Sequence, residues 1–248
     1  MKLKFIKHLK SDWFRYGFET LAVIIGILVA FALESWRDTQ KLQEEEHEIL
    51  VNLLNDLHNA EQQSFSFLNN ENASRKYLIL ALNQNSRNDS LPQAFYSDSI
   101  FNDIIWNLEM DVPIIHSYSD IMNTGKSGLI TNEKIRQRFT NLELSINNLR
   151  NQIDDRLRVQ QLRIDEIVVH DLNYVRMISL RFPEISTDDE KENDYQSILT
   201  IQRIRNILAL KLNLTQEVII YRKALDEEMK SLISLLEEEL SLHHIEIS

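Results

Sequence analysis

The chain has 248 residues, a formal net charge of −11, four Gly, three Pro and no Cys. The absence of Cys excludes disulfides, a thiolate nucleophile and Cys-type zinc sites, and the scarcity of Gly and Pro argues against a many-stranded or doubly wound fold. Because residues 1–36 hold five Lys/Arg and three Asp/Glu, the remainder carries a net −13. That charge repels phosphate backbones, so nucleic acid is not an expected partner.

Residues 1–12 form a basic amphipathic N-terminal segment. Lysines alternate there with Leu3, Phe5, Ile6 and Leu9. This pattern predicts a short helix that lies on an anionic membrane surface, so membrane lipid is an expected partner.

Residues 13–36 are predicted to form a transmembrane helix. The unbroken apolar run Leu21–Leu33 is shorter than the roughly 20 residues needed to cross a bilayer, but extension to Phe18 and Trp36 reaches that length. Aromatic residues flank the run, with Trp13 on one side and Trp36 on the other, as at membrane interfaces.

A cleaved secretory signal peptide is the alternative interpretation of this segment. Ala30-Phe31-Ala32 follows the apolar run and resembles an A-x-A cleavage site. The interfacial tryptophans have no purpose in a discarded leader, so we favour the retained span. Under either interpretation, residues 37–248 are exported.

One face of the predicted span carries small residues. Ala22, Gly26 and Ala30 recur every fourth position, a small-xxx-small pattern that permits close approach of two helices. We expect this face to be a helix-packing surface, and a homo-oligomer follows from it.

Two carboxylates, Glu19 and Glu34, lie at the two ends of the same face. They are possible ionisable membrane sites near a pore or proton path. The alternative is that both lie among lipid headgroups, with Arg15 as a partner of Glu19. We favour the headgroup position because neither carboxylate is near the middle of the span.

The flanking charges predict the orientation of the span. The first fifteen residues contain five Lys/Arg, whereas the fifteen after Trp36 contain only Arg37 and Lys41. By the positive-inside rule, the N-terminus is cytoplasmic and residues 37–248 are extracytoplasmic. We therefore expect a single-pass protein of the bacterial inner membrane.

Beyond Trp36 the chain has the pattern of long helices. Apolar residues at helical spacing predict that the spanning helix continues outward as a stalk. Residues 83–92 have the composition of a loop, and short helices are expected near 95–109 and 114–123. The stalk residues are Leu42, Ile49, Leu53, Leu57 and Ala60.

The segment 124–132 is predicted to be a corner between two helices. Gly125 suits a left-handed position after a helix, and Thr131 or Asn132 can cap the next helix. Gly125-Lys126-Ser127 also resembles the end of a phosphate-binding loop. Asp120 stands where that motif requires its first glycine and no strand precedes it, so we favour the corner.

The clearest periodicity is a row of apolar residues spaced 4-3-4-3-4, which predicts a coiled-coil seam. The helical pattern continues beyond this seam to Phe182-Pro183. An acidic loop at 186–194 and a last helix of about fifty residues follow. The seam consists of Ile135, Phe139, Leu142, Ile146, Leu149 and Ile153. We predict an all-α protein in which one transmembrane helix continues into an elongated helical bundle or an antiparallel long-helix hairpin.

No catalytic, cofactor-binding or metal-binding set emerges from the sequence. Glu44 and His47 form one Glu-x-x-His pair, but a di-metal bundle needs two such pairs. His243 and His244 are adjacent and point apart on a helix. There is no G-x-S-x-G motif. We therefore expect a protein that is not an enzyme and needs no cofactor.

Two motifs resemble an uncharacterised family of small membrane-anchored bacterial proteins. The first runs from Tyr16-Gly17-Phe18-Glu19 through Val23–Ala30 to Trp36, and the second from Tyr118 to Asn132. The resemblance implies one span and a helical outer part, without an established activity. We expect a structural, scaffold or sensor-like interaction protein with a protein partner of unknown identity. The alternative is a subunit of an oligomeric ion-conducting or transport assembly.

Overall fold

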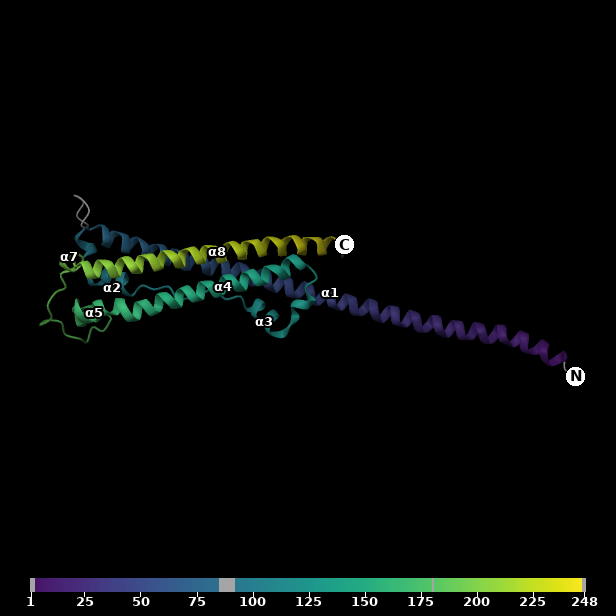
Figure 1. Ribbon diagram of the computed structural model, residues 1–248. Coiled ribbons are helices and arrows are strands. Elements are labelled where there is room, and N and C mark those ends of the chain that lie inside the picture. The colour runs from purple at the N-terminus through teal and green to yellow at the C-terminus, as the bar shows by residue number, and fades with distance from the viewer. Residues whose placement is uncertain (1–2, 85–91, 180, 247–248) are drawn as a thin grey trace.

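The computed structural model describes residues 3–84, 92–179 and 181–246, with side chains for residues 17–84, 92–179 and 181–242. These residues form helices and connecting segments and contain no β-strand, which confirms the all-α prediction. Three long helices lie side by side in an elongated bundle, and one of them extends far beyond it (Figure 1). Some of the sequence predictions concern parts of the chain that lie outside the described residues. They are the amphipathic face of residues 1–12, the side chains of Arg15, His243 and His244, and most of the loop at 83–92.

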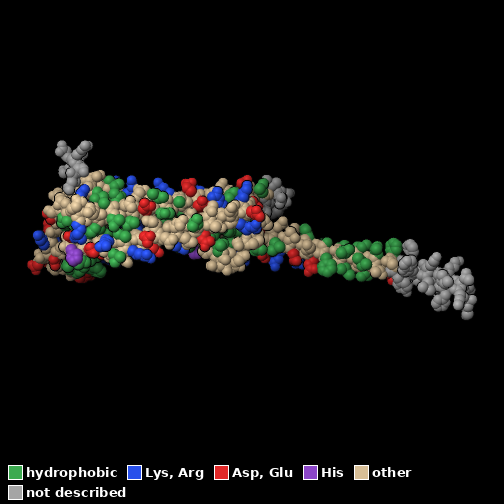
Figure 2. Space-filling model, in the orientation of Figure 1, with side chains coloured by type: hydrophobic (Ala, Val, Ile, Leu, Met, Phe, Trp, Pro, Cys, Tyr) green, Lys and Arg blue, Asp and Glu red, His purple; other side chains and the backbone are tan. Residues whose placement is uncertain are grey.

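Helix α1, Leu3–Asn83, is continuous over 81 residues. The side chains of residues 17–44 are exposed on all sides of the helix, and Figure 2 shows the apolar band on this extension. This stretch is long and apolar enough to cross a membrane, and none of its apolar window is buried. The predicted continuation of the span as a stalk is therefore confirmed.

The first connection contains short elements. After the 3-10 turn η1, Gln93–Phe95, helix α2 covers Asp98–Trp106 and begins at the cap Ser97, whose side chain accepts a hydrogen bond from the amide of Ile100. Helix α3 covers His116–Thr124. Residues 107–115 between them form no helix; the backbone is extended at Asn107 and Ile115, and Pro113 disfavours helical geometry in Val112. We call residues 107–115 the strap.

The second half of the chain contains the other two long helices. Helix α4, Glu133–Val159, passes through the π-helical turn η3, Gln160–Ile164, into α5, Asp165–His170. Short helices α6, Tyr174–Ile178, and α7, Tyr195–Ile198, precede α8, Gln202–Glu246.

One prediction about this half is wrong. The helix does not continue to residue 182, because the amide of Asn173 donates to Asn193 Oδ1 at 2.7 Å and the Asn173 side chain donates to Glu190 at 2.7 Å. These contacts with the acidic loop replace helical hydrogen bonds. Helix α8 packs against both α1 and α4, and it runs antiparallel to α4 (Figure 1), so the two helices pair within the predicted elongated bundle.

The bundle has two hydrophobic clusters, one near the stalk and one at the far end. On α1 the first buried apolar side chains are Leu50 and Leu53, whereas the predicted Leu42 is exposed and Ile49 is half-buried. The stalk-side cluster includes Leu57, Ile121, Phe139, Leu149, Leu225 and Leu232. The far cluster includes Leu78, Phe101, Ile104, Ile164, Leu199 and Leu208.

The predicted corner is confirmed. Gly125 adopts φ +71°, and the Asn132 side chain accepts from the amides of Lys134 and Ile135 at the start of α4. Asn132 also donates to Glu239 at 2.6 Å. A 3-10 turn, η2, Lys126–Leu129, completes the corner.

Thr131, the other capping candidate, has a different role. Its amide and hydroxyl donate to the buried carboxylate of Glu46 at 2.6 and 2.9 Å. The corner is thereby fastened to α1 through Thr131 and to α8 through Asn132.

Replacing Gly125 with Ala should lower the free energy of unfolding by about 1 kcal/mol, because a Cβ disfavours the left-handed conformation. Nothing lies within 4 Å of the added Cβ at either Gly125 or Gly128, and only Gly125 of the two has a positive φ. Gly128→Ala is thus a matched control with little expected effect. Chemical unfolding followed by circular dichroism measures both, and equal losses would contradict the conformational explanation.

Candidate functional site

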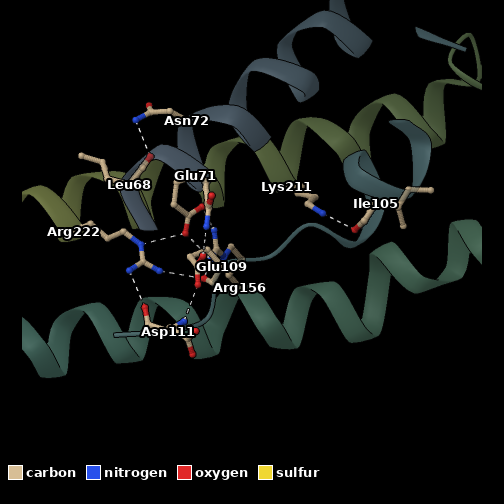
Figure 3. Close-up of polar contacts among 10 residues, drawn as sticks. Leu68, Glu71, Asn72, Ile105, Glu109, Asp111, Arg156, Lys211 and Arg222 are labelled. Carbon is tan, nitrogen blue, oxygen red and sulfur yellow. Dashed lines mark hydrogen bonds and ion pairs between the residues drawn. The ribbon is translucent and has the colours of Figure 1, made fainter. Parts of the chain in front are cut away.

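Four charged side chains are buried where the two hydrophobic clusters meet. Glu71 on α1 and Arg156 on α4 are each 1% exposed, and Lys211 and Arg222 on α8 are 0% exposed. Charged residues are almost never fully buried unless they are paired. We call these four residues the ionic layer (Figure 3).

The Glu71 carboxylate joins the three long helices. Arg156 donates to it through Nη1 at 2.6 Å and Nη2 at 2.9 Å, a bidentate pair. Arg222 donates to the same carboxylate through Nε at 3.3 Å. The planar guanidinium fork matches a carboxylate well, which explains Arg rather than Lys at position 156, and the five donors of a guanidinium allow Arg222 to bind Glu71 and backbone carbonyls together.

Other donors of the two guanidinium groups hold the strap, although Arg156 Nε is buried without a hydrogen-bond partner. Arg222 donates to the carbonyl oxygen of Asp111 at 2.8 Å and to that of Glu109 at 3.2 Å. Arg156 also donates to the carbonyl oxygen of Glu109. These carbonyls belong to an extended segment without helical partners, so the cations supply the hydrogen bonds that buried backbone requires.

Lys211 and Gln160 hold the adjoining end of α2. Both donate to the carbonyl oxygen of Ile105, Gln160 through Nε2 at 3.0 Å. Gln160 also donates to Asp165 at 3.2 Å. Burial, followed by the positive charge of Arg156, lowers the pKa of Lys211 to about 7.

The chemistry of the ionic layer is that of a structural clamp. Three cations face one fully buried carboxylate, and removing such charges from water costs several kcal/mol per ion. Direct hydrogen bonds to Glu71 and to backbone carbonyls offset this cost. A pKa of about 7 leaves part of the Lys211 amine unprotonated at neutral pH, but its exposed fraction of 0% keeps solutes from reaching it in this conformation.

The helix-packing residues predicted from the sequence lie outside the bundle. Ala22, Gly26 and Ala30 are on the exposed part of α1, and so are Glu19 and Glu34. No heavy atom lies within 4 Å of a Cβ built on Gly26, so this face is open.

The other motifs considered in the sequence remain apart from one another. Glu44 is exposed and His47 is half-buried, and no group of three or more potential metal ligands forms among the described residues. Gly125-Lys126-Ser127 follows helix α3 rather than a strand and makes the corner described above.

Sequence analysis missed the ionic layer, although a local signal existed. The 4-3 spacing that ends at Ile153 continues in register through Arg156 and Gln160. Lys211 and Arg222 similarly take core positions on α8, between Leu208 and Leu225. A charged residue at a core position of a helical seam predicts a buried partner, but it does not identify that partner.

Two open hollows lie on the surface of the bundle. One, of about 330 Å³, lies between the strap, α3 and α4 around Tyr118 and Ile146. The other, of about 310 Å³, lies between α1 and α3 around Ile49 and Ile121. Neither is lined by a His, so neither presents a Ser–His nucleophile pair.

Comparison of the chain with protein-family models, with curated proteins and with solved structures finds no match.

Replacing Glu71 with Gln should lower the free energy of unfolding by about 3–5 kcal/mol, because it leaves two buried guanidinium groups without their counter-charge. Glu48→Gln, at an exposed position of the same helix, is the matched control and should change it by less than about 0.5 kcal/mol. Denaturant unfolding of the detergent-solubilised protein measures both. Equal losses for the two variants would show that the ionic layer does not stabilise the bundle.

Proposed function

We propose that the chain is a membrane-anchored structural or interaction protein of the scaffold or sensor type. In this proposal one span holds the helical bundle outside the cytoplasm, where it contacts a protein partner. The observation that carries the proposal is the continuity of α1, from the exposed apolar stretch through to the core of the bundle. The resemblance to small membrane-anchored bacterial proteins supports the same conclusion.

The geometry of α1 suits a fixed spacer. Residues 37–45 separate the end of the apolar stretch from the first fully packed turn, a distance of about 14 Å at 1.5 Å per residue. Further along, Leu50, Leu53 and Leu57 of the same helix are fully buried. A tilt or displacement of the bundle would therefore move the span with it, because no flexible linker lies between them.

The charge distribution supports an extracytoplasmic bundle. Five basic residues precede the apolar stretch and two follow it closely, which favours a cytoplasmic N-terminus. The acidic remainder of the chain is compatible with export, since acidic residues contribute little to orientation.

Assembly through the span is a second candidate function. The open face at Gly26, between Ala22 and Ala30, would let two spans pack closely. An oligomer of this kind could place Glu19 and Glu34 along a conducting path.

When a reporter enzyme that works only outside the cytoplasm is fused after Ser248, we expect it to be active. Moving the five N-terminal basic residues to positions after Trp36 should weaken or invert this result, because Lys and Arg near the span ends set its orientation. Moving the same number of residues to the C-terminal end of the bundle is the control. Activity of a cytoplasmic reporter at Ser248 in the unaltered chain would refute the proposed topology.

Replacing Gly26 with Ile should weaken crosslinking of the isolated span in membranes at least severalfold, while insertion persists, because a larger side chain keeps the helices apart. Leu28→Ile, on another face of α1, should have little effect. Measuring the full chain in parallel separates association of the spans from association of the bundles. Unchanged crosslinking of Gly26→Ile in both contexts would exclude the small-residue face as an interface.

A further inference from the structure

The end of α2 is held by a buried amine. Lys211 Nζ donates to the carbonyl oxygen of Ile105, in the last turn of α2, and Gln160 Nε2 donates to the same oxygen at 3.0 Å. Figure 3 shows Lys211 pointing to Ile105 beside the rest of the ionic layer. The strap begins two residues later, so Lys211 and the two arginines together fix one continuous segment.

The charges around Lys211 are unbalanced. Glu71 faces it from α1, Arg156 from α4 and Asp165 from α5, and Arg222 lies in the same layer on α8. Glu71 is the fully buried carboxylate of this set, whereas Asp165 is half-buried. A protonated Lys211 therefore adds a third fully buried cation to a layer that already holds two.

The amine is the group in this layer that can release a proton near neutral pH. A guanidinium keeps its proton throughout the accessible pH range. Burial, and then the charge of Arg156, lower the pKa of Lys211 to about 7, although Asp165 and Glu71 act in the opposite direction. The charge of the layer thus changes by one unit around neutral pH.

The helix opposite Lys211 is irregular at this level. The π-helical turn η3 begins at Gln160, and Gln160 Oε1 is buried without a hydrogen-bond partner. π-helical turns are frequent at functional sites, and an unsatisfied buried acceptor lowers the cost of opening a structure locally. The contact between Lys211 and the carbonyl oxygen of Ile105, which the charge of Lys211 affects directly, therefore lies at a weak point of the bundle.

We propose that Lys211 is a proton-responsive latch, in which uptake of a proton at Nζ loosens the end of α2 and the strap from the ionic layer. The latch goes beyond the proposed function. It does not depend on the orientation of the span, because all the groups involved lie inside the bundle.

The direction of the response follows from proton linkage. When the segment opens, Lys211 reaches water and regains an ordinary pKa near 10.4, well above its value in the closed bundle. Between these two pKa values the open form binds more protons than the closed form. The closed form is therefore most stable at alkaline pH and loses stability as the pH falls toward about 7. Below about pH 7 the closed form loses no further stability through Lys211, because both forms then hold the proton.

The first measurement uses the unaltered full-length protein in detergent, with lysine labelled at the ε carbon. One lysine resonance should titrate near pH 7, well below the ordinary range of a lysine amine. This experiment needs no substitution, so it tests the latch even if a variant fails to fold. The absence of any lysine that titrates near neutral pH would overturn the proposal.

The second measurement is hydrogen exchange, corrected for the intrinsic pH dependence of the chemistry. Above about pH 7, the opening constant of residues 104–111 should fall tenfold per pH unit. Helix residues 142–149, in the stalk-side cluster, provide the internal reference. Lys211→Met should remove the pH dependence, because it keeps the length of the side chain without the proton.

Lys223→Met, at an exposed position of the same helix, is the matched control and should retain the slope. A slope that persists in Lys211→Met would assign the response to another group and overturn the latch. An equal slope in residues 142–149 would also overturn it, because the opening would then be global. Neither result bears on membrane topology, which the reporter fusions test separately.

Discussion

The Glu71 carboxylate receives guanidinium groups from both of the other long helices, and the interior of the bundle is arranged around this point. Arg156 and Arg222 meet there from α4 and α8. A lone guanidinium at the same depth would be strongly destabilising, so each arginine depends on Glu71 and on the carbonyls of the strap. The strap depends on the arginines in turn, since Pro113 and the extended backbone leave its carbonyls without helical partners.

The ionic layer lies between the two hydrophobic clusters of the core and aligns the long helices more strictly than apolar contacts do. Leu, Ile and Phe side chains can exchange places at modest cost if volume is conserved, so an apolar seam alone specifies register weakly. A buried charge tolerates one partner geometry. We infer that the ionic layer fixes the axial alignment of α1, α4 and α8, with the polar contacts of the corner adding a second constraint at Glu46 and Glu239.

The same arrangement combines rigidity with a local weak point. α1 is continuous, and its packed half carries fully buried leucines, so the stalk and the bundle behave as one body. The end of α2 instead depends on one carbonyl oxygen shared by Lys211 and Gln160. In the proposed latch, a change of charge on Lys211 releases the strap and leaves the apolar contacts of the long helices in place.

Local patterns in the sequence were sufficient for several features of the molecule. Hydrophobic periodicity predicted the helical fold and the continuation of α1, and the requirements of one turn predicted Gly125 and a cap at Thr131 or Asn132 in the corner. The spacing from Ile135 to Ile153 predicted a coiled-coil seam; all six residues of the seam are buried in the bundle, while coiled-coil geometry itself stays a prediction. These features depend on backbone conformation and on near neighbours in the chain, which a single segment specifies.

Only the tertiary structure decided which helices pack together and which charges meet. Glu71 lies 85 residues from Arg156 and 151 residues from Arg222, and no local pattern links them. The helix predicted to reach residue 182 ends at His170, because Asn173 binds a loop that lies 20 residues away in the chain. Pairing between distant residues depends on how the helices are aligned, and that alignment is set by the packing of the whole bundle rather than by any one segment.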